Sequence, residues 1–88
     1  MGFRLEVQDV FSITGRGTVV TGVVASGSVS IGDRVRLIRA DGTRREITVV
    51  GIEAFRNVLM TAETGQQVGL LLDEVGRNDV AAGDALEG

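Results

Sequence analysis

The residues of this chain best suited to chemistry lie together in the segment Glu53-Ala54-Phe55-Arg56. The segment joins a carboxylate acceptor, an aromatic ring and a guanidinium that can donate two parallel hydrogen bonds. Such a trio suits recognition of a base edge and a ribose by hydrogen bonding and stacking. The alternative is structural, with Phe55 in the core and Glu53 paired locally with Arg56. The residue types alone leave both interpretations open.

A second candidate is the glycine-rich segment Gly15-Arg16-Gly17, because such a loop can direct backbone N–H groups at a phosphate. A dinucleotide fingerprint requires a helix after its glycines, whereas a Val-rich strand is expected here. The two residues after Gly22 are valines, where a phosphate-binding loop needs Lys and then Ser or Thr. We therefore expect a tight turn between two strands and no nucleotide hydrolysis.

The composition offers little for catalysis or metal binding. The chain has no histidine and no cysteine, so the commonest catalytic base, the thiol nucleophile and the usual transition-metal ligands are all missing. The carboxylates Asp9, Glu53 and Asp73 are not shown by the sequence to converge, and no segment has the spacing of a calcium loop. We expect no enzyme activity, no metal and no cofactor in this chain.

The basic residues are unevenly distributed. All nine are arginine, yet the formal net charge is −3, whereas a general nucleic-acid binder usually carries a strongly basic surface. Five arginines crowd one predicted hairpin: Arg34, Arg36, Arg39, Arg44 and Arg45. Such a cluster can meet RNA phosphates or the carboxylates of a partner. The interleaved Asp33, Asp41 and Glu46 favour the alternative, an ordinary solvated exterior.

Alternating apolar and polar residues predict the strands that position these groups. Phe3, Leu5 and Val7 alternate with polar residues, which is typical of a strand with one buried face. A second strand is expected over residues 18–25, with Gly22 marking a bulge or a close backbone approach. A third strand is predicted where Val35 alternates with its arginine neighbours.

The second half of the chain continues this pattern. Asp41-Gly42 predicts a type I′ hairpin turn, with a returning strand over residues 47–52. Residues 49–52 are apolar on both faces, so this strand is either covered twice or presents an exposed patch. A polar loop is expected over 61–65 and a strand over 68–72. Asn78-Asp79 is expected to cap one helical turn through Ala82, before a last strand over 84–86.

These elements predict an all-β fold, a small closed antiparallel β-barrel of six or more strands, because closure removes the unpaired edges that invite aggregation. We see no internal repeat and no linker-like break, so residues 1–88 are expected to form a single domain. The N-terminus lacks the apolar run of a signal peptide, and no stretch approaches the roughly 18 apolar residues of a membrane span. A soluble cytoplasmic protein is expected.

The segment from Asp9 to Gly22, DVFSITGRGTVVTG, resembles the opening of the second domain of elongation factor Tu. Further short motifs recur in the order found in that family, so the resemblance covers nearly the whole chain from Phe3. These motifs are Gly32-Asp33, Gly51-Ile52-Glu53-Ala54-Phe55-Arg56, Gly65-Gln66-Gln67-Val68-Gly69 and Gly83-Asp84. Two positions depart from the pattern: Gln8 replaces a commonly acidic residue, and Gln67 replaces a usual asparagine.

In that family the barrel packs beside a GTPase domain and helps hold the aminoacylated 3′ end of transfer RNA. The resemblance implies that the following residues form the aminoacyl-tRNA-end site: Ile13, Val19, Glu53, Phe55, Arg56, Gln67 and Leu71. By position, Glu53 would contact the terminal adenosine, and the three aliphatic residues would line a pocket for its base. Arg56 and Gln67 would lie near the esterified amino acid, with Phe55 walling that site.

The resemblance also implies which ligands belong to another domain and which partners this chain binds. GTP and Mg²⁺ would belong to a neighbouring domain that is absent from this sequence. The expected function is therefore that of an elongation-factor binding module in protein biosynthesis, isolated or free-standing, without GTPase activity. Its implied partners are the aminoacyl-tRNA 3′ end or the ribosome, or a GTPase domain or other protein, and not a membrane. The alternative is a protein–protein docking barrel that has lost RNA binding.

Overall fold

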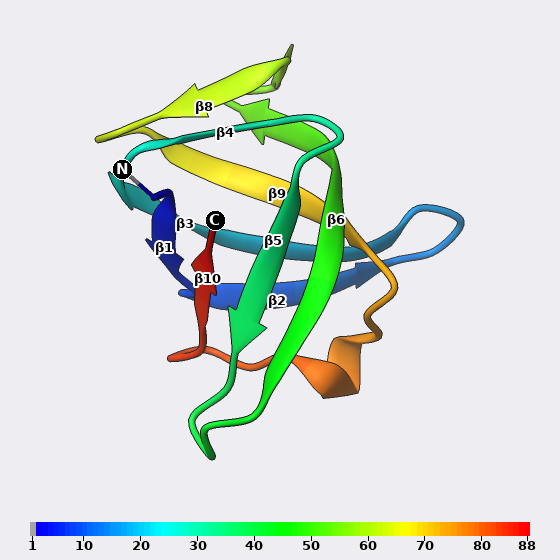
Figure 1. The fold of residues 1–88 in the computed structure, drawn as a ribbon. Helices are drawn as coiled ribbons and strands as arrows, with labels where there is room; N and C mark the ends of the chain where they lie inside the picture. The colour runs from blue at the N-terminus through cyan, green and yellow to red at the C-terminus, as the bar shows by residue number, and fades with distance from the viewer. Residues whose placement is uncertain (1) are drawn as a thin grey trace.

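The computed structural model describes residues 2–88, and nearly all of its regular structure is β-strand (Figure 1). The strands are β1 Arg4–Glu6, β2 Asp9–Ile13, β3 Gly17–Ser26, β4 Ser28–Ser30, β5 Arg34–Ile38, β6 Arg44–Ala54, β7 Asn57–Leu59, β8 Thr61–Glu63, β9 Gln67–Asp73 and β10 Ala85–Glu87. A short 3-10 turn, η1, spans Arg77–Asp79. Over residues 2–88, no helix has the length and apolar character needed to cross a membrane.

Six antiparallel strands close into a barrel. The order around it is β1, β10, β5, β6, β9 and β3, and β1 pairs again with β3 to complete the ring. Strand β2 pairs with the first half of β3, β7 pairs with the end of β6, and β4 and β8 form a small separate sheet (Figure 1). The predicted closed antiparallel barrel is therefore confirmed.

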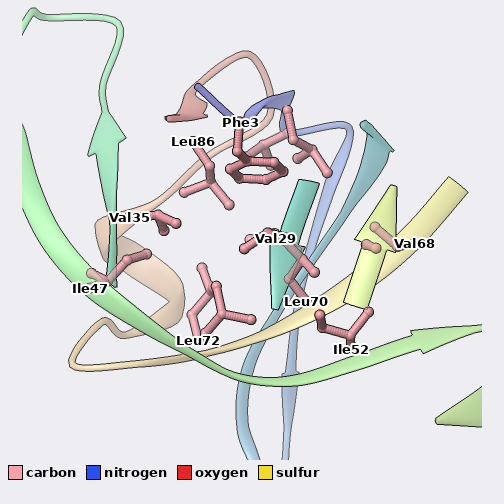
Figure 2. Packing of buried hydrophobic residues seen from close by; sticks show 14 of the residues in the cluster. Phe3, Val29, Val35, Ile47, Ile52, Val68, Leu70, Leu72 and Leu86 are labelled. Carbon is pink, nitrogen blue, oxygen red and sulfur yellow. The ribbon is translucent and has the colours of Figure 1, made fainter. Parts of the chain in front are cut away.

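Inward-facing aliphatic side chains fill the barrel (Figure 2). Leu5, Leu37, Ile47, Leu70 and Leu86 come from five different strands, and each is fully buried. Burying one such side chain contributes about 1.5–3 kcal/mol to stability. Because these residues come from five strands, each of those strands contributes to the same core. The alternation expected in the strands at the N-terminus, at Val35 and at residues 68–72 is confirmed by this packing.

Gly22 lies where β1 and β3 approach most closely. A Cβ atom at Gly22 would lie 2.4 Å from the carbonyl oxygen of Glu6 and 2.8 Å from Leu5 Cδ2. The β1–β3 register also shifts between Arg4 and Leu5. The predicted close backbone approach is confirmed, and no larger residue fits here without moving β1.

Four short strands were not predicted: β2, β4, β7 and β8. The loop expected over 61–65 is wrong in its first half, where β8 pairs with β4 and Ser30 Oγ lies 2.8 Å from Thr61 Oγ1. These strands lie at edges and are largely exposed, so most of them carry no alternating apolar pattern. The tight turn at Gly15-Arg16-Gly17 exists, but it joins β2 to β3.

The hairpin turn between β5 and β6 differs from the prediction. Gly42 has a φ of +88°, but Asp41 is not among the residues with positive φ. The Gly42 N–H donates to Arg39 O at 2.9 Å, and the Arg39 N–H donates to Thr43 O at 2.9 Å. These bonds define a three-residue loop in which an ordinary turn is followed by a left-handed glycine. The predicted type I′ turn is therefore wrong here, because the loop is one residue longer than that turn allows.

The helical turn near the C-terminus is shorter than expected. It ends at Asp79 and not at Ala82, and Asn78 and Asp79 lie within it. The Asp79 carboxylate accepts a hydrogen bond from the Gly76 N–H at 2.9 Å, so Asp79 caps the turn from inside. The final strand begins at Ala85 because the carboxylate of the preceding residue, Asp84, is buried and accepts loop N–H groups.

Candidate functional site

Residues 49–52 of β6 are apolar on both faces of the strand because the strand contains a β-bulge. The register with β9 shifts between Val49, opposite Leu72, and Gly51, opposite Leu71. The extra residue, Val50, is 41% exposed, whereas Val49 is fully buried. Of the two alternatives left by the sequence, the structure shows exposure, and it is confined to Val50. The bulge also sets the direction of the strand that leads to Glu53.

Cross-strand pairing brings apolar residues from three strands into one row on the outside of the barrel. Leu71 of β9 lies opposite Val19 of β3, and Val19 lies opposite Phe11 of β2. Directly paired residues point to the same face of a sheet, and this face is opposite the buried one. Phe11 is 51% exposed, while Val19 and Leu71 are half-buried.

Two glycines flank this row, and because they have no side chains the surface beside the row is flat. A Cβ atom at Gly51 would lie 3.2 Å from Leu71 Cβ, and one at Gly69 would lie 3.5 Å from Val19 Cγ1. We call these five residues, Phe11, Val19, Gly51, Gly69 and Leu71, the outer strip. Because no side chain rises from the two glycines, a flat ligand can lie against Leu71 and Val19.

Glu53 lies on the same face, beside the outer strip. It stands opposite Gly69 of β9 on one side and Val58 of β7 on the other. Its side chain is 45% exposed, and its Oε2 atom is 3.0 Å from Arg16 Nη2. The local Glu53–Arg56 ion pair considered from the sequence is therefore wrong, because Glu53 pairs with the β2–β3 turn instead.

Phe55 and Arg56 form the two-residue turn between β6 and β7. The strands close at the pair Ala54 and Asn57, and the φ angles of the two turn residues are 51° and 67°. Positive φ at both positions is the type I′ geometry, which glycine and asparagine adopt far more readily than bulky residues do. Phe55 is 88% exposed, so its assignment to the core is wrong. The hairpin tip holds an aromatic ring and a guanidinium out in solvent.

Gln67 begins β9 on the outer face, opposite Val23. Its Nε2 atom donates to Gln8 Oε1 at 3.1 Å, so the two residues that depart from the sequence pattern contact each other. A hollow of about 280 Å³ adjoins this amide pair, lined by Glu6, Val7, Gln8, Val23 and Ala25. The hollow offers an apolar floor with polar groups at its edge.

The structure thus gathers most of the predicted site on one surface. Val19, Glu53, Gln67 and Leu71 share the outer face, and Ile13, 38% exposed, joins them opposite Gly17 at the end of β2. The two hairpin-tip residues lie beyond this surface at the end of β6. Sequence reasoning missed Phe11, Gly51 and Gly69, and it considered Arg16 only as part of a possible phosphate loop; all four lie inside the recurring motifs.

The arginine cluster on β5 and β6 is a charged exterior in which several arginines are paired. Arg34 Nη1 lies 3.0 Å from Glu74 Oε1, and Arg34 Nε lies 3.4 Å from Glu46 Oε1. The hydrogen bond from Arg34 holds the pKa of Glu74 below its ordinary value. Arg45 Nη1 lies 3.5 Å from Asp79 Oδ2. This interleaving supports the solvated-exterior interpretation over a phosphate-binding patch.

The described part of the chain contains no group of three or more Asp and Glu side chains arranged to hold a metal ion. What the outer face offers is an apolar surface, neutral amides and carboxylates, with Glu53 beside the apolar row and Asp9 and Asp73 farther out on β2 and β9, which are groups for binding and orienting a ligand. A comparison with known families gives one finding: the family model described as elongation factor Tu domain 2 matches residues 17–87. The match begins at β3 and runs through β10.

Proposed function

The chain belongs to the elongation factor Tu domain 2 family and is a translation-factor β-barrel module; from that premise, we propose that its outer face binds the aminoacylated 3′ end of a transfer RNA. The observation that carries the proposal is the position of Glu53 beside Leu71 and Val19 on one outward surface. An apolar surface next to a hydrogen-bond acceptor is what a terminal nucleoside requires.

The terminal adenine would lie against Leu71 and Val19, with Ile13 at its edge. The flanking glycines leave room for a ring to approach, since Gly51 and Gly69 add no side chain. Glu53 would accept a hydrogen bond from the ribose or the base. A hydrogen bond to a charged acceptor contributes about 1.5–3 kcal/mol to binding. Stacking a base on an aromatic side chain contributes about 1–3 kcal/mol, and contact of the base with the aliphatic side chains here contributes at most a similar amount.

The esterified amino acid would lie toward Gln67. The amide pair of Gln8 and Gln67 is close to the hollow of about 280 Å³ described above, which can receive a small side chain. Phe55 and Arg56 extend from the neighbouring hairpin as a wall for the ester, an arrangement supported by their exposure. All these groups orient a ligand and none performs chemistry.

The proposal therefore assigns binding and no catalysis to this chain. GTP and Mg²⁺ are assigned to a neighbouring GTPase domain, and the ribosome is a further partner of the assembled factor. Because translation takes place in the cytoplasm, we expect the module there.

A second candidate function, a protein–protein docking barrel, is favoured by one observation. Phe55, Val58 and Met60 are 88%, 74% and 72% exposed, which is unusual for apolar side chains gathered within six residues. In that case the β6–β7 hairpin, and not the outer strip, would be the binding surface.

An NMR titration of the methyl-labelled chain with a short aminoacylated CCA-end RNA separates the two functions. Low salt is used because isolated nucleic-acid contacts are weak and screened. The proposal expects shifts at Ile13, Val19 and Leu71. No shift at millimolar RNA contradicts it, and binding of a protein partner that shifts only Val58 and Met60 supports docking.

A further inference from the structure

An ion pair on the outer face joins two elements that are distant in sequence. Arg16 lies in the β2–β3 turn, and its guanidinium reaches Glu53 on β6 at 3.0 Å. Because β9 lies between β3 and β6 in the sheet, the ion pair links the β2–β3 turn to a strand that does not neighbour β3. A Cβ atom at the adjacent Gly17 would lie 3.8 Å from Leu71 Cδ1, so the residue next to Arg16 is close to Leu71.

This ion pair restricts the site of the free chain. It occupies the Oε2 atom of Glu53 and so holds the Arg16 guanidinium beside the apolar row, in which Leu71 is half-buried although it points outward. The side chains of Arg16 and Glu53 are 48% and 45% exposed, so the pair is a surface ion pair of modest strength. A ligand that displaces Arg16 therefore loses about two- to five-fold in affinity.

A ligand with a phosphate recovers that loss. Once a ribose hydroxyl donates to Glu53, the released Arg16 guanidinium is still within side-chain reach of the same nucleotide. Guanidinium groups bind phosphate oxygens with two parallel hydrogen bonds, a geometry that a free nucleoside does not offer. The 5′-phosphate of the terminal nucleotide is the nearest such group in an RNA chain.

We propose that Arg16 is a further specificity-determining residue, which exchanges the Glu53 carboxylate for the 5′-phosphate of the bound terminal nucleotide. The inference rests on the proposed function, because it requires a nucleotide at Glu53 and Leu71. Arg16 thereby favours adenosine linked to an RNA chain over free adenosine. In the free chain the ion pair weakens the binding of ligands that do not offer both a hydroxyl donor and a phosphate.

The test compares two probes, adenosine and adenosine 5′-(methyl phosphate), by NMR titration of the Leu71 and Val19 methyl groups. The methyl ester carries one negative charge, like a phosphate within RNA. The wild-type chain is expected to bind the phosphate probe about five-fold more tightly than adenosine at low salt. In Arg16→Gln, adenosine binds about two- to five-fold more tightly than in the wild type, and the preference for phosphate is lost. Arg16→Lys retains part of that preference.

Arg44→Gln is the matched control, because it also removes one arginine charge but lies at the end of β6 that is far from Glu53. Salt gives a second readout: with the wild type, added salt weakens binding of the phosphate probe and strengthens binding of adenosine, because it screens the Arg16–Glu53 pair. An equal preference for the phosphate probe in Arg16→Gln and Arg44→Gln overturns the inference and leaves the proposed function standing. Failure of both probes and of the aminoacylated RNA to shift Leu71 overturns both.

Discussion

Glu53 illustrates how little a residue type says about its role until its neighbours are known. Its carboxylate could have formed a local pair with Arg56, but the strand pairing places it beside Gly69 and within 3.0 Å of Arg16. One oxygen of Glu53 is thus held by a guanidinium from another element. A half-exposed carboxylate fixed in this way is better suited to orienting a ligand than to stabilising the fold.

Replacing this carboxylate tests its role at the residue scale. In Glu53→Gln, two effects oppose each other: loss of a charged acceptor worth about 1.5–3 kcal/mol, and release of Arg16, worth about 0.2–1 kcal/mol. The first is larger and the difference is about 0.5–2.8 kcal/mol, so we expect the aminoacylated RNA to bind about two- to hundred-fold more weakly. The measurement is an NMR titration, with Glu63→Gln of the exposed strand β8 as the control. Equal affinities of the two variants would show that Glu53 does not contact the ligand.

At the scale of the element, the β6–β7 hairpin departs most from local preference. A type I′ turn normally selects Asn-Gly, yet Phe55 and Arg56 occupy it with φ angles of 51° and 67°. Bulky residues in such conformations cost about 1–3 kcal/mol each and persist mainly where function retains them. The hairpin therefore has a conformational strain that its exposed side chains do not offset by packing.

Relieving this strain should separate stability from binding. The double substitution Phe55→Asn with Arg56→Gly is expected to raise the free energy of unfolding by about 1–3 kcal/mol because both residues then suit the turn. The gain is smaller than the full strain of two residues, since Asn retains part of that cost and Gly gains entropy in the unfolded chain. Urea denaturation measures the change. If the tip contacts the ester, the same variant binds the aminoacylated RNA more weakly while its binding of adenosine is unchanged. A loss of stability would contradict the turn assignment.

The contact between β1 and β3 gives a second prediction for an element. Gly22→Ala places a methyl group 2.4 Å from Glu6 O, which is backbone and cannot move alone. We expect a loss of about 1–3 kcal/mol of unfolding free energy, the usual cost of overpacking. Gly69→Ala is the matched control, since its nearest contact, 3.5 Å to Val19, is an ordinary van der Waals distance. Equal stabilities of the two variants in urea would refute the close approach.

In the whole molecule, all six strands of the closed barrel contribute to the stability of the fold. At roughly 0.05–0.15 kcal/mol per residue, a chain of this size has few kcal/mol to lose. The ionic contacts on its exterior tie the barrel to the segment after β9: Arg34 of β5 bonds to Glu74, and Arg45 of β6 pairs with Asp79. In the first pair, the hydrogen bond from Arg34 lowers the pKa of Glu74, so this contact makes stability depend on pH.

Acid should weaken the folded barrel through Glu74 and through Asp41 of the β5–β6 loop. Hydrogen bonds from Arg34 and then Thr48 lower the pKa of folded Glu74 below 4.5, and those from Thr43 lower the pKa of Asp41 below 3.8. Because the unfolded chain then takes up protons first, this stabilisation is present above these unfolded values and is lost as pH falls through the folded ones. Urea denaturation between pH 7 and pH 3 should show a smaller acid loss for Glu74→Gln than for the wild type. Identical pH profiles would rule out this contribution.

The sequence by itself determined the class of fold. Alternating strands around Leu5, Val35 and Leu70, separated by glycine turns, suffice for an all-β barrel, because strand periodicity and turn residues are local properties. The recurring motifs also identified the family. Most of the predicted site residues lie on one outer face, while their roles in binding remain predictions.

The tertiary structure alone decided which residues meet on that face. The bulge at Val50, the pairing of Arg16 with Glu53 and the contact of Gln8 with Gln67 all depend on register between strands distant in sequence. A local pattern contains no information on such register, since a shift of one residue moves a side chain to the opposite face without changing the pattern. Packing of the shared core selects one register, and that choice brings the candidate site together.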